Sequence, residues 1–137
     1  MEFNFNIEGG NFSHAGAASS EVKKVLKQLN VDVSLIKRIV VALYEAEVNV
    51  VAHAYEGMMK VVLSSDFIEV TITDRGPGIP DISLAMKEGY STASPQVREM
   101  GFGAGMGLPN IKKNCDKLEI VSKVNEGTTV KMTTFFS

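Results

Sequence analysis

The sequence predicts an α/β fold: a two-layer sandwich in which a mixed, mostly antiparallel sheet carries helices on one face. Three observations predict it. Five short segments alternate apolar and polar residues, which is typical of strands with one buried face. Four of these segments form two pairs joined by short turns, as the strands of hairpins do. Other segments repeat apolar residues at helical spacing.

The chain begins with a strand and a helix. Phe3, Phe5 and Ile7 share one face of the opening strand, which ends at Gly9–Gly10. Ser13 is expected to cap the helix that follows, because a serine hydroxyl accepts hydrogen bonds from the free amides of a first turn. The buried stripe of this helix is formed by Val22, Val25, Leu26 and Leu29.

A long helix and a hairpin come next. Residues 35–55 contain no Gly or Pro and predict a helix, with Ser34 as its cap and Gly57 at its end. Strands are expected at 59–63 and 67–74, joined by a short turn.

The C-terminal part predicts more helix and a closing hairpin. A short helix is expected at 81–88 and another at 108–114, with a polar, irregular loop at 89–103 between them. Strands at 118–124 and 128–136 then pair across a turn.

The composition favours one domain that spans residues 1–137, because 45% hydrophobic and 22% charged residues are ordinary for a globular protein. A net charge of −2 with dispersed lysines gives no sign of a nucleic-acid surface. No apolar run approaches the ~20 residues of a membrane helix, and the first residues do not resemble a signal peptide. The single cysteine, Cys115, cannot form an internal disulfide, so we expect a structural thiol and a cytoplasmic setting.

The segment 101–111 is the most informative part of the chain, because glycines alternate there with other residues before a helix. Glycine tolerates positive φ, so several backbone N–H groups can turn toward one ligand, and the amides that open the helix add donors. This arrangement suits phosphates; a plain loop is the alternative. The candidate ligand-binding residues are Gly101, Gly103, Ala104, Gly105, Met106, Gly107 and Leu108.

Glu45 and Asn49 lie four residues apart on the long helix and share a face, which His53 continues one turn later. A carboxylate and an amide oxygen suit Mg²⁺, which keeps several waters and takes few protein oxygens beside those of phosphate. In such a site Asn49 would bind the metal, and Glu45 would orient or deprotonate the attacking group. The alternative is a solvated helix face on which Glu47 is an equal candidate.

Asp74 is expected to face the core, because strand alternation places it in register with Ile72. A buried carboxylate needs a partner, and the exocyclic amine of adenine would supply one. Gly76 and Gly78, followed by Ile79, would let the backbone approach a flat ring. The alternative is an Asp-Gly turn with the carboxylate at the solvent edge.

Thr128 and Arg98 complete the candidate site. Thr128 shares a strand face with Val130, so its hydroxyl would point inward to Asp74 or the base; an ordinary strand-forming threonine is the alternative. Arg98 is close to the glycine run in sequence, and its guanidinium would reach a γ-phosphate with two hydrogen bonds. A solvated loop arginine is the alternative.

Together these motifs resemble a known series. Glu45-x-x-x-Asn49, Asp74-x-Gly76-x-Gly78 and Gly103-x-Gly105-x-Gly107, with Gly127-Thr128, resemble in order and spacing the ATPase domain of gyrase, Hsp90, histidine kinases and MutL. The likeness covers nearly the whole chain. The small size and the ending His53-Ala54-Tyr55 resemble the branch of anti-sigma factors and serine/threonine switch kinases.

The resemblance implies a Bergerat-type fold that binds ATP and Mg²⁺ between helices and sheet. By position it implies that Glu45 is the catalytic base, that Asn49 is the Mg²⁺ ligand and that Asp74 reads adenine with support from Thr128. It further implies that Gly76 and Gly78 bound the base pocket, and that the glycines at 103, 105 and 107 wrap the phosphates.

The resemblance also implies partners. A protein serine/threonine kinase of this branch phosphorylates a small antagonist domain and thereby acts as a partner switch, with a sigma factor or a phosphatase as its other partner. The alternative is a nucleotide-sensing binding module that changes shape with ATP and transfers no phosphate. Neither nucleic acid nor a membrane is expected as a partner, and a homodimer is one possible oligomeric state.

Overall fold

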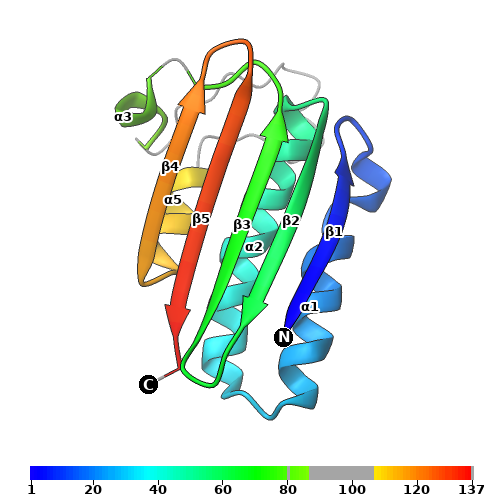
Figure 1. Cartoon of the computed structure of the whole chain (residues 1–137), viewed down its shortest axis with the longest axis vertical. Coiled ribbons are helices and arrows are strands. Elements are labelled where there is room, and N and C mark those ends of the chain that lie inside the picture. Colours follow the sequence, from blue (N-terminus) through cyan, green and yellow to red (C-terminus); the bar gives the residue numbers. More distant parts are fainter. Residues whose placement is uncertain (80, 87–106, 137) are drawn as a thin grey trace.

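A computed structural model describes residues 1–79, 81–86 and 107–136 of the chain. Its strands form one sheet in the order β1-β2-β3-β5-β4, and each of these neighbouring pairs is antiparallel. Helices α1, α2 and α5 lie on one face of the sheet, behind it in Figure 1, and among the described residues no helix covers the opposite, open face. The strands are β1 (Glu2–Glu8), β2 (Glu56–Leu63), β3 (Phe67–Arg75), β4 (Lys117–Lys123) and β5 (Gly127–Phe135). The helices are the 3-10 turn η1 (Phe12–His14), α1 (Ala17–Gln28), α2 (Val33–His53), α3 (Ile82–Ala85) and α5 (Gly107–Lys113).

The core lies between the sheet and the helices. Alternate residues of the strands, such as Met59, Val70 and Ile72, are buried against the helix layer, as the period of two in the sequence predicts. The central helix α2 fills this layer with apolar residues such as Leu43 and Val50. The predicted fold class, an α/β sandwich with helices on one face of the sheet, is therefore confirmed. The prediction allowed a mixed sheet, whereas every strand pair in the described residues is antiparallel.

The start and the end of α2 differ from the prediction. The cap is Asp32, whose carboxylate accepts a hydrogen bond from the Ser34 N–H at 3.0 Å, so Ser34 lies inside the helix rather than capping it. The helix ends at His53, and Gly57 belongs to β2 instead of terminating the helix. A Cβ atom on Gly57 would lie 2.8 Å from Val50 Cγ1, so the glycine lets this strand pack closely under α2.

The start of α1 also differs. Ser13 lies in η1, where its hydroxyl donates to Asn11 Oδ1 at 2.8 Å, and the N-cap position belongs to Gly16 with a φ of 93°. No side chain at that position caps the helix. Three members of the expected stripe are at least partly buried, whereas Leu29 is 47% exposed because it follows the last helical residue.

The second half agrees closely with the prediction. The helix expected at 108–114 and the two closing strands each lie within one residue of their predicted bounds. The helix expected at 81–88 is shorter, since α3 ends at Ala85. The loop expected at 89–103 lies outside the described residues. Within the described parts of the chain, no helix is both long enough and apolar enough to cross a bilayer.

Candidate nucleotide-binding site

The face of α2 that carries Glu45 and Asn49 packs against α5. Asn49 is half-buried, and a Cβ atom on Gly107 would lie 3.0 Å from the Asn49 Oδ1 atom. The absence of a side chain at Gly107 therefore lets the start of α5 rest directly on the Asn49 amide. The structure thus brings Asn49, predicted as a Mg²⁺ ligand, next to the last glycine of the run predicted to hold phosphates.

Glu45 lies one turn earlier on the same face and is half-buried. Burial raises its pKa, and the nearby Asn110 side chain on α5 partly offsets that rise. A carboxyl group with a raised pKa is a stronger base once it is ionised. Asn110 lies within the segment 101–111 but was not among the candidate residues, and only the packing of α5 on α2 reveals its place beside Glu45.

Glu47 has a different environment, which removes the alternative that it is an equal candidate. It is only 2% exposed, and its carboxylate turns away toward the start of α1. There it accepts hydrogen bonds from the backbone N–H groups of Gly16, Ala18 and Ser19 at 3.0, 3.2 and 2.9 Å. The Ser19 hydroxyl donates a fourth bond at 2.6 Å. This carboxylate is fully used in holding two helices together.

Asp74 lies near the end of β3 on the side that faces the helices and is half-buried, as the alternation predicts. Burial raises its pKa, and a hydrogen bond from the Thr128 N–H lowers it in part. This bond, 3.0 Å long, joins the Thr128 nitrogen to Asp74 Oδ1. Thr128 itself is buried at the start of β5, so the structure places both residues together although 54 positions separate them.

The loop after β3 is fixed to the tip of the β4–β5 hairpin. The Gly76 N–H donates to the Glu126 carbonyl at 3.3 Å, and the Asn125 N–H donates to the Pro77 carbonyl at 2.8 Å. Gly78 has a φ of 77°, and a Cβ atom there would lie 3.0 Å from the Cα of Val124. Both the backbone conformation and the close approach therefore require glycine at position 78.

Ser122 binds this loop at Ile79, and sequence reasoning missed it. Its Oγ accepts a hydrogen bond from the Ile79 N–H at 2.7 Å and lies 2.8 Å from the Thr128 Oγ1. Ser122 occupies the helix-facing side of β4, which it shares with Leu118 and Ile120. A lone hydroxyl at an otherwise apolar strand position was the signal that could have identified it.

The residues around Asp74 and the helix face that carries Glu45 and Asn49 meet at the end of α2. A Cβ atom on Gly76 would lie 2.9 Å from the Cα of Ala54, the residue that follows α2. His53, the last residue of that helix, is half-buried, and burial lowers its pKa, which favours the neutral imidazole. The loop after β3 therefore touches the helix that carries Glu45 and Asn49.

Part of the predicted site lies outside the described residues: Arg98, Gly101, Gly103, Ala104, Gly105 and Met106. Leu108 is described and is buried in the core, so only its backbone could serve a ligand. Three or more metal-binding side chains of His, Cys, Asp or Glu do not come together anywhere in the described residues. The expected Mg²⁺ site differs from such a cluster, since one amide oxygen would suffice beside phosphate oxygens.

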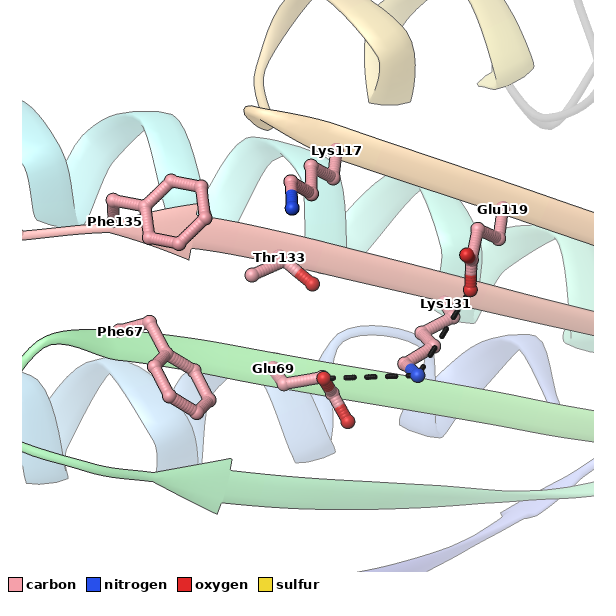
Figure 2. Close-up of a pocket in the computed structure, with 7 residues that line it drawn as sticks. All are labelled: Phe67, Glu69, Lys117, Glu119, Lys131, Thr133 and Phe135. Atoms are coloured by element: carbon pink, nitrogen blue, oxygen red, sulfur yellow. Dashed lines mark ion pairs between the residues drawn. The ribbon is translucent and has the colours of Figure 1, made fainter.

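A hollow lies on the face of the sheet opposite the helices, away from all these residues (Figure 2). Three of its charged side chains are paired with one another: Lys131 lies 3.7 Å from Glu69 and 3.9 Å from Glu119. Lys117 lies 5.4 Å from the ring centre of Phe135. None of the predicted site residues lines this hollow, so it is separate from the candidate site.

The fold and the match to a family model show to which class of protein the chain belongs. Residues 11–134 match the histidine kinase-like ATPase domain, and the chain belongs to this family. The resemblance inferred from the motifs is thereby confirmed, and membership implies the use of ATP.

Individual proteins are also similar to this chain over most of its length. The anti-sigma F factor of Thermoanaerobacter sp. (strain X514) is 31% identical over 140 residues, which cover 98% of this chain and 92% of the relative. The serine/threonine-protein kinase RsbT of Bacillus subtilis is 30% identical over 119 residues, or 84% of each chain. A solved structure of the RsbU and RsbW domains of a Mycobacterium tuberculosis protein shares the fold, with a TM-score of 0.66 and 17% identity. The match covers 98% of this chain and 32% of that one.

Proposed function

We propose that this chain is an ATP-dependent protein serine/threonine kinase that acts as a partner switch in bacterial signalling, and that residues 1–137 form its single ATP-binding domain. One observation carries the proposal: Glu45 and Asn49 lie one turn apart on α2 and both face the start of α5, where the glycine run ends. The relatives named as anti-sigma F factors and as a serine/threonine-protein kinase support it.

The base of ATP would lie between the end of β3 and the β4–β5 hairpin. Asp74 would accept a hydrogen bond from the exocyclic amine, with Thr128 beside it. Gly76 and Gly78 would keep the loop that carries Ile79 close to the ring, and His53, whose pKa is lowered by burial, would lie at the adjoining end of α2. The glycine run from Gly101 to Gly107 would surround the phosphates, and Arg98 would bind the γ-phosphate.

Glu45 would perform the proton transfer. Its carboxylate would accept the proton of a serine or threonine hydroxyl as that oxygen attacks the γ-phosphorus and the bond to the β-phosphate oxygen breaks. Asn49 would hold Mg²⁺ through Oδ1, and the bound ion would supply charge neutralisation on the phosphates. The half-buried position of Glu45 suits a base, because burial raises its pKa toward neutrality.

The partners follow from this activity. The substrate would be a small antagonist domain with a phosphorylatable serine or threonine, and its release would free the chain for a sigma factor or a phosphatase. We further propose a cytoplasmic location, where ATP is supplied, and a homodimer as the form to test by light scattering.

The test is transfer of labelled γ-phosphate from ATP to a candidate antagonist domain. We expect Glu45→Gln to lower the transfer rate by at least a hundredfold while ATP binding is kept, since a positioned base contributes about 10²–10⁴ in rate. Glu21→Gln, on the exposed face of α1, is the matched control and should transfer normally. Unchanged transfer by Glu45→Gln would refute the assigned base. ATP-dependent binding of the partner without any transfer would instead favour a nucleotide-sensing binding module.

A further inference from the structure

Ser122 makes more contacts than a structural hydroxyl at the edge of a sheet requires. It is half-buried on the helix-facing side of β4, and three groups surround its Oγ: the Ile79 N–H at 2.7 Å, the Thr128 Oγ1 at 2.8 Å and the Gly127 carbonyl at 3.3 Å. Ile79 belongs to the loop that follows β3, and Thr128 donates its N–H to Asp74. Ser122 therefore connects both walls of the candidate base pocket.

The protons of this cluster can be counted. A serine hydroxyl carries one proton and two acceptor lone pairs, and the Ile79 N–H occupies one lone pair. The Gly127 carbonyl can only accept, so it is a fixed acceptor for the Ser122 proton. Either hydroxyl can donate in the 2.8 Å contact between Ser122 and Thr128. When the Ser122 proton is directed at the Gly127 carbonyl, Thr128 is the donor in that contact. In this arrangement the Thr128 oxygen keeps only lone pairs for a ligand.

The direction of that bond matters because Asp74 alone does not choose between purines. A carboxylate accepts equally from the 6-amino group of adenine and from the N1–H and 2-amino groups of guanine. An acceptor-only Thr128 oxygen beside it favours a 6-amino group and repels the 6-oxo group of guanine. A Thr128 hydroxyl that was free to rotate could donate to that oxo group instead.

We propose that Ser122 is a positioning residue that fixes the Thr128 hydroxyl as an acceptor beside Asp74 and so makes the pocket selective for a 6-amino purine over a 6-oxo purine. This inference rests on the proposed nucleotide site. It assigns the discrimination to a side chain that need not touch the base, acting through Thr128 and through the loop residue Ile79.

The experiment measures the dissociation constants of ATP and of GTP by calorimetry for the wild type and its variants. We expect Ser122→Ala to lower the preference for ATP over GTP by about fivefold or more, which is the effect of one neutral hydrogen bond. Ser122→Thr keeps the hydroxyl and should restore the preference. Thr129→Ala, on the open face of the neighbouring strand, removes a hydroxyl outside the cluster and should leave the preference unchanged. Ser122→Cys, with similar volume and a weak donor, replaces the alanine variant if that variant does not fold.

The ratio of the ATP and GTP dissociation constants distinguishes a role of Ser122 in positioning the Thr128 hydroxyl from simple support of the loop. A loosened pocket wall would weaken both nucleotides alike, so an unchanged ratio in Ser122→Ala would overturn the proposal even if both affinities fell. A wild type that binds neither nucleotide would overturn the proposed function, and this inference with it.

A second measurement needs no nucleotide. Hydrogen exchange at the Ile79 amide should be slow in the wild type and in Ser122→Thr, and at least fivefold faster in Ser122→Ala, since its acceptor is gone. Equal exchange in all three proteins would show that the bond to Ser122 does not hold the loop, and would overturn the proposal whatever the chain binds.

Discussion

At the scale of single residues, the half-buried Glu45 binds its proton more tightly than an exposed glutamate does. Burial raises its pKa, and the Asn110 side chain offsets this rise only in part. His53 changes in the opposite direction, since burial lowers the pKa of its imidazole. One helix face therefore carries a carboxylate that holds its proton more tightly and an imidazole that releases its proton more easily, both because water is partly excluded.

The pH dependence of phosphoryl transfer should report the raised pKa of Glu45. A general base works only when it is deprotonated, so kcat/KM should be full above that pKa and fall as the pH drops through it. The fall should be centred above the range in which exposed glutamates titrate. Asn110→Ala removes the group that lowers this pKa and should move the fall to higher pH, whereas Lys112→Ala, on the exposed side of α5, should not. An acid limb at the ordinary pKa of glutamate would contradict the role given to burial.

At the scale of elements, the start of α1 depends on a side chain from another helix. The first amides of a helix lack partners within it, and Gly16 offers no side chain to satisfy them. The Glu47 carboxylate of α2 accepts three of these N–H groups together with the Ser19 hydroxyl. A negative group at a helix N-terminus is also favoured by the helix dipole. Packing of α1 on α2 and capping of α1 are thus one interaction.

Replacing this carboxylate should destabilise the fold. Glu47→Gln puts an NH₂ group against N–H donors, so we expect the free energy of unfolding to drop by about 2–4 kcal/mol, the cost of leaving buried groups unpaired. Urea denaturation measures the loss, with Glu21→Gln as an exposed control that should change stability by less than about 0.5 kcal/mol. A loss below about 1 kcal/mol in Glu47→Gln would mean that the amides of α1 are satisfied in another way.

The contact between Glu47 and the start of α1 shows why the strands and helices could be predicted but some helix ends could not. The alternation of Met59, Val70 and Ile72 indicated the strands and their buried faces, because burial on one side imposes a period of two. Ser13 was wrong as a cap because a local signal cannot reveal that Glu47 of another helix supplies the acceptor. Ser34 was wrong because Asp32, an equally local candidate two residues earlier, supplies it. The presence of the helices could be predicted from the sequence, whereas the residues at which they begin and end depended on contacts with neighbouring residues and elements.

At the scale of the whole molecule, the strand order assembles the candidate site. Because β5 lies between β3 and β4, Thr128 has Asp74 on one side and Ser122 on the other. The sequence indicated Asp74 and Thr128 individually, through their inward register. It could not indicate Ser122 or Asn110, since their importance depends on which strand lies beside β5 and on how α5 crosses α2.

Binding of ATP should therefore stabilise the entire domain, since its contacts would join β3, the β4–β5 hairpin, α2 and α5. We expect a micromolar dissociation constant, about −7 to −8 kcal/mol. Mg²⁺-ATP at a hundred times that concentration adds about 2.7 kcal/mol to the free energy of unfolding. For a chain of this length the melting temperature should rise by on the order of 5–10 °C in scanning calorimetry.

Asp74→Asn tests whether this coupling passes through the base pocket. The asparagine oxygen can still accept the Thr128 N–H, so the free protein should melt near the wild-type temperature, but its NH₂ group would oppose the exocyclic amine of the base. We expect most of the ATP-induced rise to disappear in this variant and to persist in Asp66→Asn, at the exposed β2–β3 turn. If Asp74→Asn kept the full rise, the nucleotide would bind without this carboxylate, and the shared hydrogen bond between β3 and β5 would have no part in linking ligand binding to the stability of the sheet.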